Sequence, residues 1–289
     1  MRCSKHLVPG YDRIVPPGRT DRRTFQICNL HLGDRETMIR PEHFNMRSGN
    51  PVLTDSTFDV TQRGSLRPMT LSGVINRSIL LLLLVAGTSA GVWSYSSSHP
   101  SVIYPMVMIG ALGGFVVAMV TSFKKEWSPV TSPVYAVLEG LFIGGISLVM
   151  EQRFPGLVLQ AVMLTFGVMF ALLAAYQSRI IRPSQTFKSV IVGATFGIVV
   201  VYLISMVMQL FFHTGIPLIN GNGPMGIAFS LVVVGIAALN LVLDFDFIEN
   251  GVAAGAPKWM EWYAAFGLTV TLVWLYIEIL RLLSKMRRN

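Results

Sequence analysis

The sequence contains few charged residues for its length. Of its 289 residues, 13% are Asp, Glu, Lys or Arg, whereas about 25% is usual in a soluble domain. Because 52% of the residues are hydrophobic, this balance excludes an ordinary soluble protein. A membrane β-barrel is excluded as well, since its strands alternate between apolar and polar residues over about ten positions. The apolar runs of this chain do not alternate.

The sequence also lacks the residue sets that carry most enzyme and metal chemistry. Its two cysteines, Cys3 and Cys28, are too few for a disulfide framework and lack the spacing of metal ligands. No HExxH motif, Walker loop or GxGD motif is present. None of the five histidines lies inside an apolar run, where it would serve a serine or cysteine nucleophile as a base. We therefore expect no enzymatic activity, no catalytic residues, no metal site and no resident cofactor.

Seven apolar runs are long enough to cross a bilayer, which takes about 20 residues of helix. They span approximately Ile75–Ser96, Ser101–Phe123, Ser132–Met150, Gly156–Tyr176, Phe187–Phe212, Met225–Ile248 and Trp262–Leu283. The sequence therefore predicts an all-α, polytopic membrane protein with a bundle of seven transmembrane helices.

A polar segment precedes these runs. Residues 1–74 are basic, lack apolar periodicity and are expected to form a largely disordered tail, with residues 75–289 as the transmembrane domain. Met46 begins "MRSGNPVLTD" and is a second candidate start, so residues 1–45 are either an extension or a misassigned start. The phrase "TLSGVINR" suggests a short interfacial helix capped by Thr70 or Ser72.

The basic residues indicate an orientation rather than nucleic-acid binding. Twelve of the 23 Lys and Arg precede residue 78, and most of the others fall in alternate loops. This asymmetry places the N-terminus in the cytoplasm, and we expect no nucleic-acid partner.

Seven crossings, however, put the C-terminus outside, where four basic residues cluster: Arg281, Lys285, Arg287 and Arg288. Either late charges have little influence on topology, or six crossings are combined with a re-entrant segment.

Two GxxxG motifs predict close helix packing. They are "GLFIG", from Gly140 to Gly144, and "GATFG", from Gly193 to Gly197. Glycines four residues apart lie on one helix face and allow a second backbone to approach.

Acidic residues inside the predicted spans are the first candidates for function. An ionised side chain at mid-membrane costs about 2.5–3.5 kcal/mol on insertion scales, and such residues are usually paired or functional. The candidates are Glu139, Asp244, Asp246 and Glu278. No Lys or Arg occupies the centre of a predicted span, so protons or cations are the expected counterparts of these carboxylates.

Helical geometry separates the two aspartates. Residues two apart differ by about 200° around a helix axis, so Asp244 and Asp246 point in nearly opposite directions. Asn240 lies one turn before Asp244 and shares its face, which predicts a polar stripe toward the bundle interior. Asp246 shares its face with Glu249 and Asn250, and a solvated helix end explains it as well as a sensing role does.

The other two candidates each have a structural explanation beside the functional one. Arg281 follows Glu278 by three residues, which is the spacing of an intrahelical ion pair. Hydroxyl groups such as those of Ser132 or Thr131 would satisfy Glu139. For both glutamates a proton-sensing or cation-sensing role remains open.

Three segments together resemble one family. "LVLDFDFIENG" (241–251), "LVWLYIEILRLL" (272–283) and "YAVLEGLFIGGIS" (135–147) are similar to helices 6, 7 and 3 of the Bax-inhibitor/YccA family of seven-helix membrane proteins. The resemblance covers roughly residues 70–285 and is nearest in style to actinobacterial members. It therefore implies the plasma membrane of a bacterium.

The resemblance also implies a function for two carboxylates. Asp244 matches the family's helix-6 aspartate, and Glu278 occupies the position of its helix-7 aspartate. In the family this pair forms a proton-sensitive latch in a calcium-leak pathway, which implies transient calcium binding. Two carboxylates held close together cannot easily both ionise and therefore titrate as a unit. Ionisation would then attract a cation and bias a helix rearrangement.

The spacing of this sequence strains that pairing. Asp244 lies 11 residues before the "GAP" turn and Glu278 lies 21 residues after it. At about 1.5 Å per residue, straight helices would leave the two carboxylates some 15 Å apart in depth. A kink near Gly267, or a sixth helix that continues past Gly251, would reduce this offset.

Two functions follow from these observations. The first is a pH-regulated leak channel or transporter for calcium or other cations, in which the buried acidic residues sense protons or cations. The alternative is a regulator that does not transport ions and that binds membrane proteins, such as a membrane-bound protease. The long basic tail favours the regulator, whereas the intramembrane carboxylates favour the channel.

Overall fold

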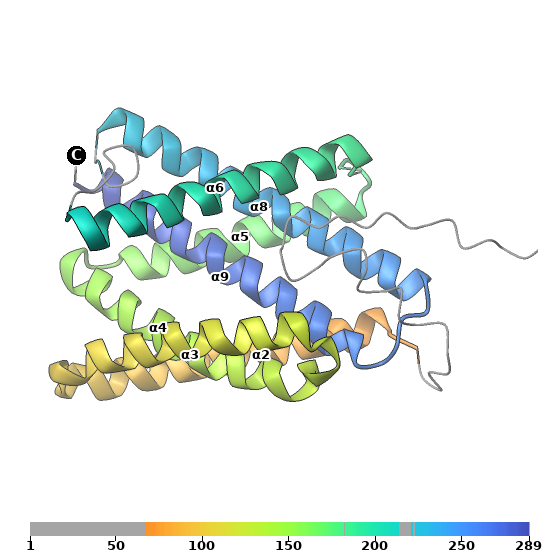
Figure 1. Ribbon diagram of the computed structural model, residues 1–289, viewed down its shortest axis with the longest axis horizontal. Coiled ribbons are helices and arrows are strands. Elements are labelled where there is room, and N and C mark those ends of the chain that lie inside the picture. Colours follow the sequence, from red (N-terminus) through yellow and green to blue (C-terminus); the bar gives the residue numbers. More distant parts are fainter. Residues whose placement is uncertain (1–67, 182, 214–220, 222, 289) are drawn as a thin grey trace, which may run out of the picture. The chain divides into compact units, whose positions relative to one another are not determined.

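The computed structural model describes residues 68–181, 183–213, 221 and 223–288 (Figure 1). Over this part of the chain the structure is helical without strands, and one isolated bridge pairs Pro68 with Pro257. Seven helices are long and apolar enough to cross a membrane, which confirms the predicted all-α membrane fold. The tail up to residue 67, with Cys3, Cys28 and Met46, lies outside the described residues.

The helices agree closely with the predicted spans. In chain order they are α2 (Leu71–Ser98), α3 (Ile103–Phe123), α4 (Ser128–Arg153), α5 (Leu157–Gln177), α6 (Gln185–Phe212), α8 (Pro224–Ala253) and α9 (Met260–Met286), with short 3-10 turns at Pro100–Val102 and Lys125–Trp127.

One boundary differs from the sequence prediction. Because α2 begins at Leu71 and is continuous, "TLSGVINR" supplies its first turns and is no separate interfacial helix. Thr70 is the N-cap, and its hydroxyl accepts a hydrogen bond of 3.1 Å from the Gly73 amide.

Local sequence signals explain where the last helices begin and end. The Ser184 hydroxyl caps α6 by accepting a hydrogen bond from the Phe187 amide. Pro224 is the first residue of α8, where its fixed φ and missing N–H are tolerated. Gly255 follows α8 with a φ of +67°, a left-handed conformation that favours glycine. The chain therefore reverses between Ala253 and Met260, and α8 packs antiparallel to α9.

Helix α9 is the packing centre of the membrane region. It contacts α2, α4, α5 and α8 (Figure 1). One buried cluster joins α9 to α2, α4 and α8 through residues such as Val74 and Phe266. A second joins α9 to α5 and α8 through residues such as Leu157 and Leu275. Polar residues on α9 are therefore surrounded by protein rather than by lipid.

Helices α3 and α6 lie at the periphery. Helix α3 packs chiefly against α4, and α6 packs chiefly against α8. Their outer faces carry exposed large apolar side chains, such as Phe115 on α3 and Phe196 on α6. Such an extended apolar surface is expected where a protein contacts a membrane.

The four basic residues near the C-terminus are held by protein groups. Arg281 pairs with Glu278, and Lys285 donates to the Gly226 carbonyl. The remaining two contact the α4–α5 connection, through a hydrogen bond from Arg287 to the Pro155 carbonyl at 2.7 Å and through Arg288, 5.6 Å above the Phe154 ring. Since α9 is one continuous helix of 27 residues and is among the seven that are long and apolar enough to cross a membrane, the structure favours seven crossings over six with a re-entrant segment.

Candidate proton and cation site

Asp244 and Asn240 lie buried on one face of α8. The exposed fraction is 0% for Asp244 and 1% for Asn240. The Asn240 amide donates to the Thr195 hydroxyl of α6 at 2.8 Å and to the Ile236 carbonyl at 2.9 Å. The side-chain oxygen of Asn240, Oδ1, is buried and accepts no hydrogen bond from the described part of the chain. The predicted polar stripe therefore faces the protein interior, and it contains an acceptor that water or a cation would satisfy.

Glu278 is also buried, with an exposed fraction of 1%. The Tyr202 hydroxyl of α6 lies 2.9 and 3.0 Å from its two carboxylate oxygens. The predicted ion pair with Arg281 is present at 3.4 Å, and the Arg281 guanidinium also lies 4.9 Å from the centre of the Tyr202 ring. One carboxylate, one phenol and one guanidinium thus form a compact polar cluster where α6 meets α9.

The two carboxylates lie at different levels along the antiparallel helices α8 and α9. Asp244 lies nine residues before Ala253, the last residue of α8. Thr269 lies nine residues after Met260, the first residue of α9, and is therefore level with Asp244. Glu278 lies another nine residues along α9. Nine residues of helix correspond to about 13 Å.

Two further contacts support this register. Lys285 of α9 donates to the Gly226 carbonyl and the Ser230 hydroxyl near the start of α8. Tyr202, which binds Glu278, packs against Phe229 in the same part of α8. Glu278 is therefore level with the first half of α8, far from Asp244.

The structure thus does not bring the two carboxylates together as the resemblance implied. Helix α8 does continue past Gly251, but α9 is continuous through Gly267, and the offset persists. The buried polar residues of α9 that are level with Asp244 are Thr269 and Thr271. We refer below to the Asp244 level, which includes Asn240 and Thr195, and to the Glu278 level, which includes Tyr202 and Arg281.

Asp246 has a partner that the sequence prediction missed. Its carboxylate pairs with Lys188 of α6 at 2.5 Å and accepts a hydrogen bond from Asn250 at 3.0 Å. The lysine side chain is 7% exposed and that of Asp246 is 18% exposed. Of the two explanations left open for Asp246, the freely solvated helix end is wrong, because Lys188 in the first turn of α6 pairs with the carboxylate.

The expectation that the acidic residues lack basic partners was therefore also wrong. Lys188 and Arg281 pair with Asp246 and Glu278, and Lys285 is a third basic residue, buried near the start of α8. Arg281 was predicted as a partner of Glu278, but counting only the centres of the predicted spans missed Lys188 and Lys285, because long side chains reach inward from helix ends.

Glu139 of α4 is buried, with an exposed fraction of 8%, and faces α3. The two hydroxyls expected to satisfy it bind carbonyls instead: Ser132 donates to Trp262, and Thr131 donates to Trp127. The partner of Glu139 is the hydroxyl of Tyr135, one turn earlier on the same helix. Glu139 is thus separate from both carboxylate levels.

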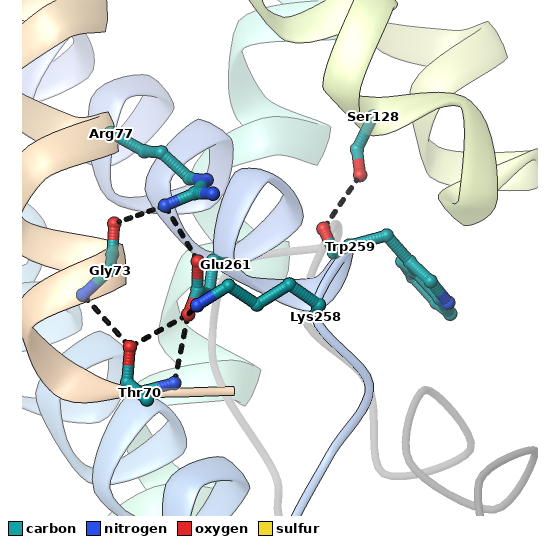
Figure 2. A network of polar contacts seen from close by, with 7 residues as sticks. All are labelled: Thr70, Gly73, Arg77, Ser128, Lys258, Trp259 and Glu261. Atoms are coloured by element: carbon teal, nitrogen blue, oxygen red, sulfur yellow. Dashed lines mark hydrogen bonds and ion pairs between the residues drawn. The ribbon is translucent and has the colours of Figure 1, made fainter. Parts of the chain in front are cut away.

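A third buried carboxylate cluster surrounds Glu261 (Figure 2). Its side chain is fully buried and lies 2.6 Å from Arg77 and 2.6 Å from Lys258. The amide and hydroxyl of Thr70 add hydrogen bonds of 2.9 and 2.8 Å. The last predicted span begins at Trp262, one residue after Glu261, so the sequence analysis did not single out this cluster, although Arg77 and Glu261 stand near the ends of two predicted spans.

The Glu261 cluster joins the beginning of α2 to the beginning of α9. A Cβ added at Gly73 would lie 2.1 Å from a Glu261 carboxylate oxygen, so only glycine leaves room for this side chain. Beside it, the Met69 amide donates to the Ala256 carbonyl at 2.6 Å. The residues that enter α2 are therefore bound to the turn between α8 and α9.

The two GxxxG motifs lie in different surroundings. A Cβ at Gly140 or Gly144 would lie within 3 Å of atoms of α2, and the Ser89 hydroxyl of α2 donates to the Gly140 carbonyl at 3.0 Å. At Gly193 and Gly197 an added Cβ would meet no atom within 4 Å in the described part of the chain. Only the first motif therefore lies at a close helix contact within this chain.

Among the described residues, no group of three or more His, Cys, Asp or Glu side chains is arranged to hold a metal ion. Calcium takes six to eight oxygen ligands, so the described side chains at the Asp244 and Glu278 levels form no complete coordination cage.

A family model described as Bax inhibitor 1 like matches residues 50–288, a range that includes both carboxylate levels and the Glu261 cluster. The match agrees with the resemblance drawn from the three sequence segments. Neither the curated proteins nor the solved structures gave a match.

Proposed function

The chain belongs to the Bax inhibitor 1 like family, and from that premise we propose that it is a pH-regulated leak pathway for cations, with calcium as the principal ion. The pathway lies in the plasma membrane of a bacterium, with the N-terminus in the cytoplasm. Protonation of buried carboxylates controls the leak.

One observation carries the proposal: three buried carboxylates lie inside membrane-spanning helices and away from the helix ends, unlike Glu261 in the first turn of α9. Their exposed fractions are 0% for Asp244, 1% for Glu278 and 8% for Glu139. Since an ionisable group costs free energy inside a membrane, its presence there usually serves a function. Carboxylates exchange protons and are also the protein ligands that calcium prefers.

Polar groups extend along the contact between α6, α8 and α9. Thr195, Asn240 and Asp244 form one level, and Tyr202 with Glu278 forms the other, about 13 Å away along the helices. A cation that passes between these helices therefore meets two separate acidic positions rather than one paired latch. The free acceptor on Asn240 adds a neutral ligand at the first position.

Arg281 sets the condition for cation binding at Glu278. Because Arg281 already pairs with this carboxylate, an entering cation has to displace the guanidinium. The face of the Tyr202 ring, 4.9 Å from the guanidinium, attracts cations and keeps Arg281 nearby when it leaves. Protonation of Glu278 removes both attractions, to Arg281 and to the entering cation.

Calcium flux in proteoliposomes tests this proposal. The full chain is reconstituted around a calcium-sensitive dye, and the initial flux is measured as the external pH is varied. We expect a pH-dependent flux that falls by about tenfold in Asp244→Asn, a change equivalent to about 1.4 kcal/mol in a barrier.

Glu249→Gln is the matched control on the same helix, because Glu249 is exposed near the end of α8. It should retain the wild-type flux and its pH dependence. The proposal is abandoned if the wild-type protein conducts no calcium, or if Asp244→Asn and Glu249→Gln conduct equally.

The regulator remains a second candidate, because the basic tail has no part in the proposed pathway. Twelve of the 23 basic residues precede residue 78, and such a segment suits an acidic partner, for example on a membrane-bound protease. Removal of residues 1–67 tests it and leaves Met69 and Thr70 in place. If the shortened protein conducts calcium like the wild type but no longer acts on its partner in cells, the regulator is favoured.

The proposed orientation has its own test. Seven spans between residue 71 and residue 286 place the two ends of the membrane region on opposite sides. A reporter fused after Asn289 should therefore be active outside the cytoplasm. A cytoplasmic signal from this fusion would contradict seven crossings with a cytoplasmic N-terminus.

A further inference from the structure

A cavity of about 490 Å³ lies between α2 and α5, and helices α4 and α9 form its floor. Its mouth is open, because Ala86 and Ala90 on α2 and Phe166 on α5 are exposed. We call this cavity the α2–α5 groove. It is distinct from the polar contact between α6, α8 and α9.

The walls of the groove suit a hydrocarbon. No charged residue lines it. The hydroxyls of Ser147 and Tyr276 bind each other at 2.6 Å, and the Ser89 hydroxyl donates to the Gly140 carbonyl. Because these polar groups already have partners, a polar ligand would gain little there, whereas an apolar one would leave no buried group unsatisfied.

The length and position of the groove match one leaflet of a bilayer. Along α2 it extends from Leu82 to Ser94, twelve residues or about 18 Å of helix. Half of a hydrocarbon core about 30 Å thick is about 15 Å. On α5 its lining begins at Val158, in the first turn. The groove therefore occupies the half of the membrane in which α2 ends and α5 begins.

The groove is continuous with the surface that faces lipid. Beside its mouth, α2 presents Leu83 and α5 presents Leu159 and Met163, all with exposed fractions of 59% or more. The hydrocarbon that covers these side chains in a bilayer reaches the mouth of the groove directly.

Positive charge gathers at the same membrane face. Arg153 ends α4 and is exposed. Arg287 and Arg288 contact the connection that leads into α5, through Pro155 and Phe154. The nearby Glu151 carboxylate accepts hydrogen bonds from the first turn of α5. Arginine side chains suit phosphate, so this face complements a phospholipid headgroup.

We propose that the α2–α5 groove binds one hydrocarbon chain of a phospholipid from the leaflet in which α2 ends, with the lipid phosphate near these arginines. The bound chain contacts Leu272, Val273 and Tyr276 on α9, the helix that also carries Glu278. Lipid occupancy thereby acts on the packing centre of the protein. The proposal does not depend on ion transport.

Retained lipid provides the first test. The full chain is reconstituted in vesicles of phosphatidylglycerol and phosphatidylcholine, extracted in mild detergent and weighed by native mass spectrometry. We expect one phospholipid per chain in the wild type and about a tenfold lower occupancy in Ala90→Phe, which fills the groove. Ala171→Phe is the matched control, since Ala171 is exposed on α5 but does not line the groove. Equal retention by all three proteins overturns the proposal.

A measurement on the wild type covers the case in which Ala90→Phe does not fold. A phospholipid with a photoreactive group on its chain is activated in vesicles, and the adducts are mapped after proteolysis. Adducts should concentrate on segments 82–94 and 158–166. Adducts spread evenly over the exposed faces of α3 and α6 would overturn the proposal.

Discussion

Helix α9 carries two buried glutamates near its opposite ends, and they differ in what holds them. Glu261 lies between two basic residues and Thr70, and all four shortest distances are 2.9 Å or less. Glu278 has the phenol of Tyr202 and one guanidinium at 3.4 Å, from its own helix. The partners of Glu261 come from α2 and its N-cap and from the turn before α9, whereas among the described residues only Tyr202 ties Glu278 to another helix.

The comparison separates a structural role from a functional one. A carboxylate enclosed by two cations stays ionised and fixes the elements around it. A carboxylate with one guanidinium at 3.4 Å and one phenol has fewer partners to give up when it binds a metal ion. We therefore assign Glu261 to the assembly of α2 with α9 and Glu278 to the proposed pathway.

The largest expected effect is the loss of stability in Glu261→Gln. Removing one member of a buried ion pair leaves the other charge uncompensated and costs about 3 kcal/mol. Thermal unfolding in detergent should show a large decrease in the midpoint, whereas Glu278→Gln should lower it less. Glu126→Gln, an exposed acid before α4, serves as the control. If Glu278→Gln is the less stable of the two glutamine variants, the assignment of roles is reversed.

Gly73→Ala tests the same cluster from the side of α2. The added methyl group would lie 2.1 Å from the Glu261 carboxylate, and overpacking of this kind costs about 2 kcal/mol. Gly87→Ala on the same helix meets no atom within 4 Å and should be neutral or slightly stabilising. Equal unfolding midpoints for the two variants would show that the cluster tolerates displacement.

Tyr202→Phe sharpens the other half of the comparison. It removes the one hydroxyl that links α6 to Glu278, a hydrogen bond to a charged group that contributes about 1.5 kcal/mol. We expect a modest decrease in stability together with a changed calcium flux in proteoliposomes. A variant with altered stability but wild-type flux would place Glu278 outside the pathway.

Lys258→Gln should have the smallest effect. The lysine side chain is 42% exposed, and pairs open to solvent contribute about 0.5 kcal/mol. Arg77 and Thr70 remain to hold Glu261. A loss as large as that of Glu261→Gln, measured by the same thermal unfolding, would mean that Lys258 rather than Arg77 holds the cluster together.

Much of the fold could be predicted from the sequence, because the bilayer imposes long apolar helices with few exceptions. All seven spans were found, and the N-cap at Thr70 was one of two residues expected. The helix ends were less accurate: α2 and α8 extend several residues beyond the apolar runs. Polar residues at helix ends, such as Lys188 and Glu261, were not singled out, because hydropathy does not show what packs beside them.

The candidate site could be predicted only in part. Helical periodicity correctly placed Asn240 and Asp244 on one interior face, since that relation is local. The relation between Asp244 and Glu278 is not local, and it depends on the register of α8 against α9. The sequence spacing already suggested an offset, and the turn at Gly255 preserves it. Tyr202, the partner of Glu278 from α6, had no signal in the sequence beyond its aromatic ring.

The central claim is that Asp244 and Glu278 act as two separate acidic positions in a cation pathway. A double-mutant cycle on calcium flux across a range of pH, with Asp244→Asn, Glu278→Gln and the double variant, tests it most directly. Independent positions predict that the two effects multiply, so that two reductions of about tenfold give about a hundredfold reduction in the double variant. A double variant that conducts no less than either single one would contradict the claim, because it would show that the two carboxylates act as one unit.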